Sequence, residues 1–201
     1  MTVTIDYYFA PNSPWTYLGH QRLCDIAQAA GAEVRVRPVD LGGKVFPMSG
    51  GLPLAKRAPQ RQAYRLLELQ RFSRWLNAPL NPEPTFFPVD PGLAAQLIIA
   101  VDQHDGTAAA LKVTGAVLRA VWAQNRNIAD EVTLLAILDA QGVPAARLEA
   151  AHSQAVHERY ETYTAAAIAV GVFGAPSYVV AGEIFWGQDR LDFLERRLQQ
   201  G

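Results

Sequence analysis

Ser13 stands between a short alternating apolar segment, residues 3–9, and a helical pattern that Pro14 opens. A side chain at such a strand-to-helix turn projects over the carboxyl end of a sheet, where open α/β folds bind ligands. The unpaired N–H groups and the positive end of the helix dipole favour an anion there and stabilise a thiolate. Ser13 is therefore a candidate anion-binding residue, and the same chemistry also suits a serine that only caps the helix.

Cys24 is the only cysteine and lies inside the helical pattern, away from its start. One thiol cannot form an internal disulfide or a CxxC pair, which excludes disulfide scaffolds and dithiol oxidoreductases. We interpret Cys24 as a small buried hydrophobic residue and expect a cytoplasmic protein. No metal site is expected, because no two histidines share a helix face with a carboxylate. The histidines are His20, His104, His152 and His157.

Composition predicts a folded protein with almost no net charge. Of the 201 residues, 50% are hydrophobic and 18% are charged, which argues against disorder and suits one domain or a domain with a large insertion. Eighteen basic and nineteen acidic residues give a net charge of −1, so we expect no nucleic-acid or membrane partner. Residues 162–182 are uncharged, but Gly171, Gly174 and Pro176 divide them into pieces too short to span a membrane. We interpret them as the end of a buried helix followed by a buried strand. The first nine residues lack a signal-peptide pattern.

The elements that position Ser13 are a strand, a helix and a second strand. Residues 3–9 alternate in polarity, residues 14–30 have helical spacing up to Gly31, and residues 33–41 alternate again. A strand, helix and strand in this order predict a parallel pair with a right-handed crossover.

The last part of the chain has the order strand, strand, helix. Residues 177–180 and 183–186 are short apolar strands joined at Ala181-Gly182, which predicts a hairpin. Residues 189–200 predict a helix with Asp189 in its first turn. Its expected buried stripe is Leu191, Phe193, Leu194 and Leu198.

The middle of the chain predicts helices only, with an ordered, proline-rich crossing at residues 77–91. The expected helices are 57–76, with Tyr64, Leu67, Phe72 and Trp75 at helical spacing, then 92–103, 107–123, 131–140 and 145–170. We predict an α/β fold: a thioredoxin-like sheet, built from βαβ and ββα units, with a large all-helical insertion. The predicted domains are 1–45 with 165–201, and 46–164.

Two motifs at opposite ends of the chain resemble a known family. Ser13-Pro14-Trp15-Thr16 occupies the position of the Cys-Pro-x-Cys dithiol in DsbA-type oxidoreductases, with hydroxyls in place of both thiols. The wider segment 6–19 resembles the opening of the 2-hydroxychromene-2-carboxylate isomerases and the related kappa-class glutathione transferases. Segments 171–177 and 185–191 resemble the C-terminal signature of the isomerases.

The resemblance implies glutathione as cofactor, bound by Ser13, Pro14, Ala175, Pro176, Gln188 and Asp189. Ser13 would donate a hydrogen bond to the glutathione sulfur and hold it as a thiolate, which makes Ser13 the implied catalytic residue. Pro176 would be a cis-proline, the alternative being a trans-proline that starts a strand. Asp189 would meet the γ-glutamyl ammonium, the alternative being a helix-capping aspartate.

The resemblance also implies an aromatic carboxylate substrate, for which we expect a pocket formed by Tyr8, Trp15, Lys44, Phe46, Asp90 and Trp186, with Tyr7 and Tyr17 as further aromatic wall candidates. Relatives carry a run like Phe-Lys-Ala-Thr-Gly-Asn where residues 46–51 read Phe-Pro-Met-Ser-Gly-Gly. Lys44 is our candidate for the missing cation. Asp90 stands where an asparagine is common.

A basic cluster precedes and follows the start of the 57–76 helix: Lys56, Arg57, Arg61, Arg65, Arg71 and Arg74. It suits a solvated helix face. Alternatively, one or two of these cations, with Lys56 and Arg57 nearest the loop, attract a carboxylate substrate or glutathione.

The function implied by the resemblance is glutathione-dependent cis–trans isomerisation of 2-hydroxychromene-2-carboxylate in aromatic hydrocarbon breakdown, by reversible thiolate addition. The alternatives are a kappa-like glutathione transferase, in which the adduct is released, and a non-catalytic binding protein of thioredoxin fold. Related proteins are homodimers, so a homodimer is expected.

Overall fold

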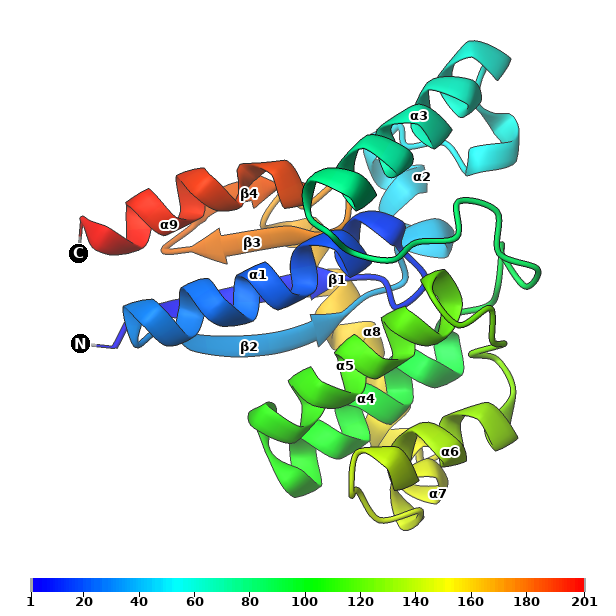
Figure 1. The fold of residues 1–201 in the computed structure, drawn as a ribbon. Coiled ribbons are helices and arrows are strands. Elements are labelled where there is room, and N and C mark those ends of the chain that lie inside the picture. Colours follow the sequence, from blue (N-terminus) through cyan, green and yellow to red (C-terminus); the bar gives the residue numbers. More distant parts are fainter. Residues whose placement is uncertain (1, 201) are drawn as a thin grey trace.

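The structure is a computed structural model that describes residues 2–200 (Figure 1). It has the predicted order βαβ, helices, ββα. The first unit is β1 (Thr4–Phe9), α1 (Pro14–Ala30) and β2 (Glu33–Pro38), and the last is β3 (Ser177–Val180), β4 (Glu183–Trp186) and α9 (Leu191–Gln199). Between them lie α2 (Phe46–Ser49), α3 (Pro59–Trp75), α4 (Gly92–Asp105), α5 (Thr107–Trp122), α6 (Glu131–Ala140), α7 (Ala146–Ala151) and α8 (Gln154–Ala169).

The four strands form one mixed sheet in the order β2-β1-β3-β4. β1 pairs in parallel with β2, and β3 pairs antiparallel with both β1 and β4. Tyr7 lies opposite Val36 on one side and Tyr178 on the other, so the first and last units are joined through their central strands. The predicted α/β fold with a thioredoxin-like sheet and a large helical part is confirmed.

α1 begins and ends where its sequence predicts. Ser13 is the N-cap and Pro14 is the first helical residue, where its lack of an N–H costs nothing. Gly31 ends the helix in the left-handed conformation, with φ of 61°, which glycine adopts without steric strain. The helix therefore presents its N-terminus, with no acidic residue in its first turn, at the carboxyl end of β1.

Three helix and strand bounds differ from the prediction. The expected helix 145–170 is two helices, α7 and α8, because the Ser153 hydroxyl accepts a hydrogen bond from the Val156 N–H and starts a new helix. The expected strand 33–41 ends at Pro38. Beyond it the Asp40 carboxylate accepts from the Gly43 N–H, and residues 41–49 continue as short helical turns. α9 begins at Leu191, after a 3-10 turn at Gln188–Arg190.

The main hydrophobic core runs from the sheet into the helical region without a break. Its buried members include Ile5 and Leu23 beside the sheet and Leu97, Val117 and Leu134 in the helices. A smaller cluster on the other face of the sheet contains Tyr8, Val39, Val45, Ala167, Val172 and Val179. The division into domains 1–45 with 165–201 and 46–164 stays a prediction, and α8 runs across its second boundary. No helix within residues 2–200 has the length and apolar character to cross a membrane.

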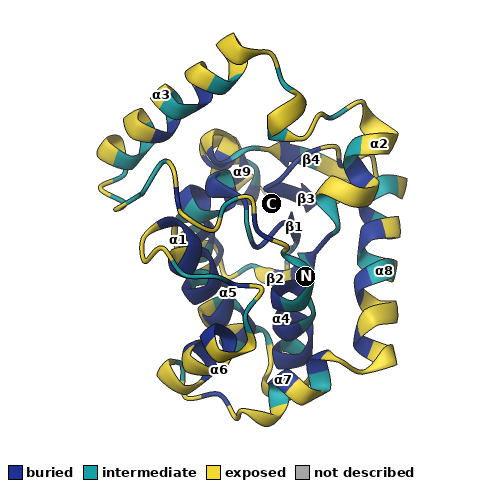
Figure 2. Cartoon of the chain, turned by 90° about the vertical axis from the view of Figure 1, so that its right-hand side faces the viewer, coloured by how far each residue is buried: buried dark blue, intermediate teal, exposed yellow. Residues whose placement is uncertain are grey.

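Two predicted apolar stripes are only partly buried. On α3, Leu69 is buried, whereas Tyr64, Leu67 and Trp75 are exposed, because α3 projects away from the sheet and is exposed along most of its length (Figures 1 and 2). On α9, Leu191, Leu194 and Leu198 are buried as expected, whereas Phe193 is 55% exposed. The helical spacing was correct in both cases. The prediction that Phe193 belongs to the buried stripe of α9 was wrong.

A buried hydrogen-bond chain ties β1, α1 and α5 together through His20. The His20 Nε2 lies 2.9 Å from the Leu111 carbonyl and Nδ1 lies 3.3 Å from the Tyr7 hydroxyl. Since a carbonyl only accepts, Nε2 carries the proton and Nδ1 accepts from Tyr7. Burial lowers the pKa of His20 from 6.5 to about 4, so the ring is neutral in the folded protein.

The pKa of His20 makes the folded protein less stable in mild acid. Above pH 6.5 the ring is neutral in both states; between pH 6.5 and 4 only the unfolded state gains the proton, so stability falls with falling pH. We expect the free energy of unfolding to lose about 2 kcal/mol from this residue between pH 7 and 5. Urea unfolding at pH 7 and pH 5 measures this loss in wild type and in His20→Gln. The control is His157→Gln, because His157 is exposed. Equal pH dependence in wild type and His20→Gln would contradict the prediction.

Candidate active site at one edge of the sheet

Strand register brings segments of the first and last units of the chain to one edge of the sheet. Tyr8, next to the end of β1, pairs with Ser177, the first residue of β3, which also pairs with Trp186, the last residue of β4. Residues that follow β1 and β4 or precede β3 therefore share this edge, which faces the viewer in Figure 2. It carries the predicted glutathione residues Ser13, Pro14, Ala175, Pro176, Gln188 and Asp189.

Ser13 caps α1 and keeps a hydroxyl proton for a ligand. Its Oγ accepts a hydrogen bond from the Thr16 N–H at 3.2 Å, and its own N–H donates to the Ala10 carbonyl at 3.0 Å. The side chain is 7% exposed. In this geometry the oxygen is used as an acceptor while the O–H remains able to donate to an anion at the positive end of the helix. Both the capping and the functional interpretation of Ser13 fit this arrangement.

Thr16 occupies the second hydroxyl position of the motif and is completely buried. Its Oγ1 has no hydrogen-bond partner among residues 2–200. Cys24 lies in the middle of α1, away from its N-terminus. Burial raises the pKa of its thiol to about 11, so the thiol is protonated at neutral pH. The described part of the chain holds no group of three His, Cys, Asp or Glu side chains that could bind a metal.

The segment before β3 is built closely around Pro176. The Ala175–Pro176 peptide bond is cis, as the resemblance implied, and the Pro176 carbonyl accepts from the Gly187 N–H at 2.9 Å. The Ser177 hydroxyl donates to the Gly174 carbonyl at 2.8 Å. A Cβ on Gly174 would lie 2.2 Å from the Trp186 indole nitrogen, so only glycine allows the indole to lie against this backbone.

Gln188 and Asp189 follow β4 and lie against α1. Gln188 is 1% exposed, and its backbone carbonyl accepts from the Arg22 guanidinium at 3.2 Å. The Asp189 carboxylate accepts from Arg190 at 2.6 Å and is about half exposed. Because the Asp189 carboxylate reaches solvent at this edge, it can release Arg190 and pair with the ammonium group of a ligand instead.

The predicted aromatic pocket residues lie around the same edge in different degrees of burial. Trp15 meets the edge of Phe72 with ring centres 6.1 Å apart, and Trp186 packs on Phe173 at 4.7 Å. Phe46 lies under the Arg57 guanidinium, and Tyr8 is buried in the smaller core cluster. Of the other wall candidates, Tyr7 is completely buried and the Tyr17 hydroxyl donates to the Pro79 carbonyl at 2.5 Å. Their contact with a substrate stays a prediction.

The two predicted polar pocket residues already have partners. Lys44 forms an ion pair with Glu161 of α8. Asp90 accepts a hydrogen bond from the Gly92 N–H at 2.8 Å and so stabilises the start of α4. The neighbouring Val89 carbonyl accepts from the Asn12 amide at 2.8 Å, which holds residues 87–90 beside the loop that carries Ser13.

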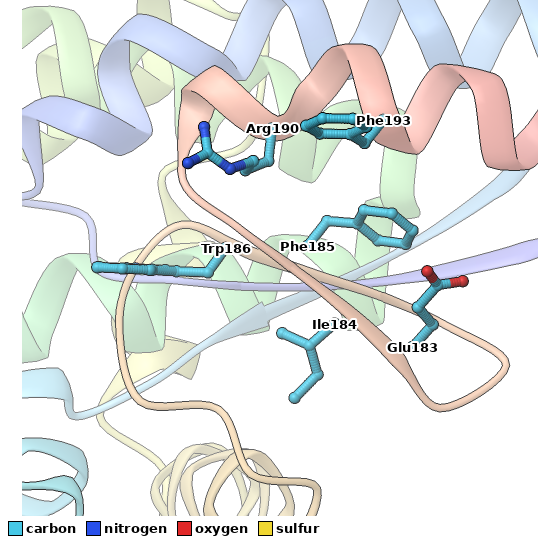
Figure 3. Close-up of a pocket in the computed structure, with 6 residues that line it drawn as sticks. All are labelled: Glu183, Ile184, Phe185, Trp186, Arg190 and Phe193. Atoms are coloured by element: carbon cyan, nitrogen blue, oxygen red, sulfur yellow. The ribbon is translucent and has the colours of Figure 1, made fainter.

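A cavity of about 410 Å³ lies along β4 and the start of α9. In Figure 3 the side chain of Trp186 points away from that of Phe185, as successive residues of a strand do, while Phe185 lies near Phe193. The lining residues are Glu183, Ile184, Phe185, Trp186, Arg190 and Phe193. Trp186 thus faces both this cavity and the backbone beside Pro176.

Arg65 is the residue whose environment the sequence interpretation missed. The basic cluster suited a solvated helix face, but Arg65 is 8% exposed. It lies on the same face of α3 as Leu69 and Phe72, at spacings of four and seven residues, which is the spacing of a buried stripe. That spacing was the available signal.

Comparisons with known proteins agree on the kind of molecule. The family model described as DSBA-like thioredoxin domain matches residues 4–199. A 2-hydroxychromene-2-carboxylate isomerase from Sphingobium xenophagum is 32% identical, covering 98% of this chain and 99% of its own. Glutathione S-transferase kappa 1 from Rattus norvegicus is 24% identical over 94% and 88%. A solved structure of 2-hydroxychromene-2-carboxylate isomerase superposes with a TM-score of 0.77 at 27% identity, covering 98% of this chain and 95% of that one.

Proposed function

The chain belongs to the DSBA-like thioredoxin domain family and, within it, to the 2-hydroxychromene-2-carboxylate isomerases, and on that premise we propose that it uses glutathione to convert 2-hydroxychromene-2-carboxylate to trans-o-hydroxybenzylidenepyruvate. The observation that carries this proposal is Ser13: a hydroxyl able to donate, at the N-terminus of α1, in the place of a dithiol.

The residues at the sheet edge fit glutathione. A single serine and a helix N-terminus suit the thiol of a bound cofactor, because both stabilise a thiolate and neither forms a disulfide with it. The Gly174 and Pro176 carbonyls already accept from Ser177 and Gly187, so Ala175 is the residue whose backbone would meet a peptide-like ligand. Asp189 would offer a carboxylate for an ammonium. These are the residues that would hold the tripeptide.

When bound, glutathione would supply the thiolate nucleophile for reversible addition to the conjugated acid. Ser13 donates a hydrogen bond to the sulfur and so lowers the pKa of the thiol. The start of α1 adds the positive potential of its unpaired N–H groups. Trp15 and Trp186 would provide flat apolar surface for the aromatic ring of the substrate.

Two other functions stay as alternatives. A kappa-like transferase is favoured by the 24% identity to the rat enzyme, and it would release the adduct instead of returning glutathione. A non-catalytic binding protein would keep the fold without turnover. Product analysis separates isomerase from transferase, and calorimetric titration with glutathione identifies a protein that does not bind it.

Purified protein is expected to isomerise 2-hydroxychromene-2-carboxylate in the presence of glutathione without consuming it. The ultraviolet change is followed with and without glutathione, the product is identified, and total glutathione is measured before and after. Glutathione loss in proportion to product would replace the isomerase with a transferase. No reaction by a protein that still binds glutathione would point to a different unsaturated acid.

The proposal includes a cytoplasmic, dimeric enzyme that acts on aromatic breakdown products. A single unpaired cysteine and a need for reduced glutathione both suit a reducing compartment. On α3 the side chains of Tyr64, Leu67 and Trp75 are exposed and form an apolar surface that a second copy of the chain would bury in a dimer. Light scattering at micromolar concentration measures the mass, and a monomer would exclude the dimer.

A further inference from the structure

The Arg65 guanidinium is buried against two aromatic rings, Phe87 and Trp122, that also contact each other, with ring centres 4.8 Å apart. Its central carbon lies 5.3 Å from the ring centre of Phe87 and 5.7 Å from that of Trp122. Within residues 2–200 its Nη2 has no hydrogen-bond partner, and no carboxylate forms an ion pair with it. Burial, together with the charge of Arg57, lowers the pKa of Arg65 to about 10, so the side chain is still charged at neutral pH.

A buried arginine without a counter-charge is unusual. Burial removes water from the charge, and contact with aromatic faces offsets only part of that cost. Charged groups in protein interiors are normally paired or hydrogen-bonded. Arg65 therefore has unused donors in an environment where an anion would gain from them.

The same arginine lines a cavity of about 230 Å³ between α3 and residues 82–88. The walls are mostly apolar, and the lining residues are Leu54, Gln62, Arg65, Leu66, Pro82, Glu83, Pro84, Phe87 and Pro88. Sites for whole drug-sized ligands are larger, about 300–1,000 Å³. This cavity suits one end of a small, flat molecule.

The cavity adjoins the loop that carries Ser13. Pro88 lines it, and the next residue, Val89, accepts the 2.8 Å hydrogen bond from Asn12, which precedes Ser13. We propose that Arg65 binds the carboxylate of the aromatic substrate in this cavity. The inference rests on the proposed function for the identity of the substrate, while the site itself rests on Arg65.

A carboxylate fits the chemistry better than a larger anion. The planar guanidinium can donate two parallel hydrogen bonds to a carboxylate, and the apolar walls accept the ring attached to it. Lys44, the cation expected from the sequence, is already paired with Glu161. Glu83, the carboxylate among the lining residues, is exposed and forms no ion pair with Arg65 within the described chain. The charge of Arg57 nearby adds positive potential.

The first test uses a probe that needs no catalysis. Calorimetry compares benzoate with benzamide, its uncharged counterpart, on wild type, Arg65→Met and Arg61→Met. Arg65→Met keeps an apolar chain and removes an uncompensated buried charge, so it is expected to fold. Benzoate should bind to wild type and Arg61→Met and at least 10-fold more weakly to Arg65→Met, with benzamide weak throughout. Equal benzoate binding to Arg65→Met, or none to wild type, would overturn the proposal.

The second test asks whether the site serves the reaction. With the chromene carboxylate, Arg65→Met should raise KM about 10- to 100-fold while the Kd for glutathione stays unchanged. An unchanged KM would overturn the substrate assignment. If wild type has no isomerase activity the proposed function fails, and the benzoate titration still decides the Arg65 site.

Discussion

Replacing Ser13 with alanine is expected to lower kcat at least about 100-fold while the protein stays folded, because losing one donor to a developing anion costs on the order of 10²–10³ in rate. The variant also loses the 3.2 Å cap to Thr16, which reduces the free energy of unfolding by about 1 kcal/mol. Without the donated hydrogen bond the pKa of the bound thiol rises, so remaining activity should shift to higher pH. Steady-state kinetics between pH 6 and 9 measures the fall in kcat and the shift in its pH dependence.

Ser153→Ala is the matched control for Ser13→Ala. Ser153 also caps a helix, accepting from the Val156 N–H at 3.4 Å, and α8 starts outside the sheet edge. Both variants lose a cap, so a similar fall in stability is expected, measured by urea unfolding. Only Ser13→Ala should lose activity. Full turnover by Ser13→Ala with glutathione bound would mean that Ser13 is a cap and nothing more.

Replacing Gly19 with alanine is expected to destabilise the protein by about 1–3 kcal/mol, although alanine in an open helix position gains about 1 kcal/mol over glycine. A Cβ at this position would lie 2.8 Å from both the Gln188 Cβ and the Tyr178 hydroxyl, and both residues are buried. To relieve the overlap, α1 and residues 187–190 must separate. We therefore expect glutathione affinity to fall together with stability.

Gly42→Ala is the control for Gly19→Ala, since a Cβ on Gly42 meets nothing within 4 Å. Urea midpoints and glutathione titrations of the two variants give the comparison. A Gly19→Ala protein as stable as wild type would show that the contact between α1 and Gln188 can relax without loss. If Gly42→Ala also weakened glutathione binding, the same result for Gly19→Ala could not be attributed to the contact between α1 and Gln188.

Local patterns predicted the elements nearest the site because local chemistry determines them. The Ser13-Pro14 start and Gly31 end of α1 follow from capping and backbone preference. Alternation identified β1 and β2, and two short apolar runs joined at Ala181-Gly182 identified β3 and β4. The break between α7 and α8 was missed because Ser153 suits both a helix interior and a cap, and sequence alone does not decide between them.

Tertiary position decided the rest. Helical spacing identified the apolar residues of α3, but whether Tyr64 and Trp75 are covered depends on how far α3 extends beyond the sheet. Arg65 was grouped with the exposed arginines, because its burial against Phe87 and Trp122 depends on tertiary packing that the sequence does not show. Lys44 could not be known to pair with Glu161, which is 117 residues away.

The position of β3 beside β1 also has a consequence for the newly synthesised chain. Tyr7 pairs with Tyr178, so this contact closes a loop of the whole helical region, and the entropy lost on closure grows with the logarithm of loop length. A helical region that has already folded shortens the effective loop. Because the N-terminus is synthesised first, the sheet beside Ser13 is incomplete until β3 and β4 have been synthesised and have paired with β1. The proposed glutathione site combines residues of the first and last units, so it forms only after β3 and β4 have been synthesised.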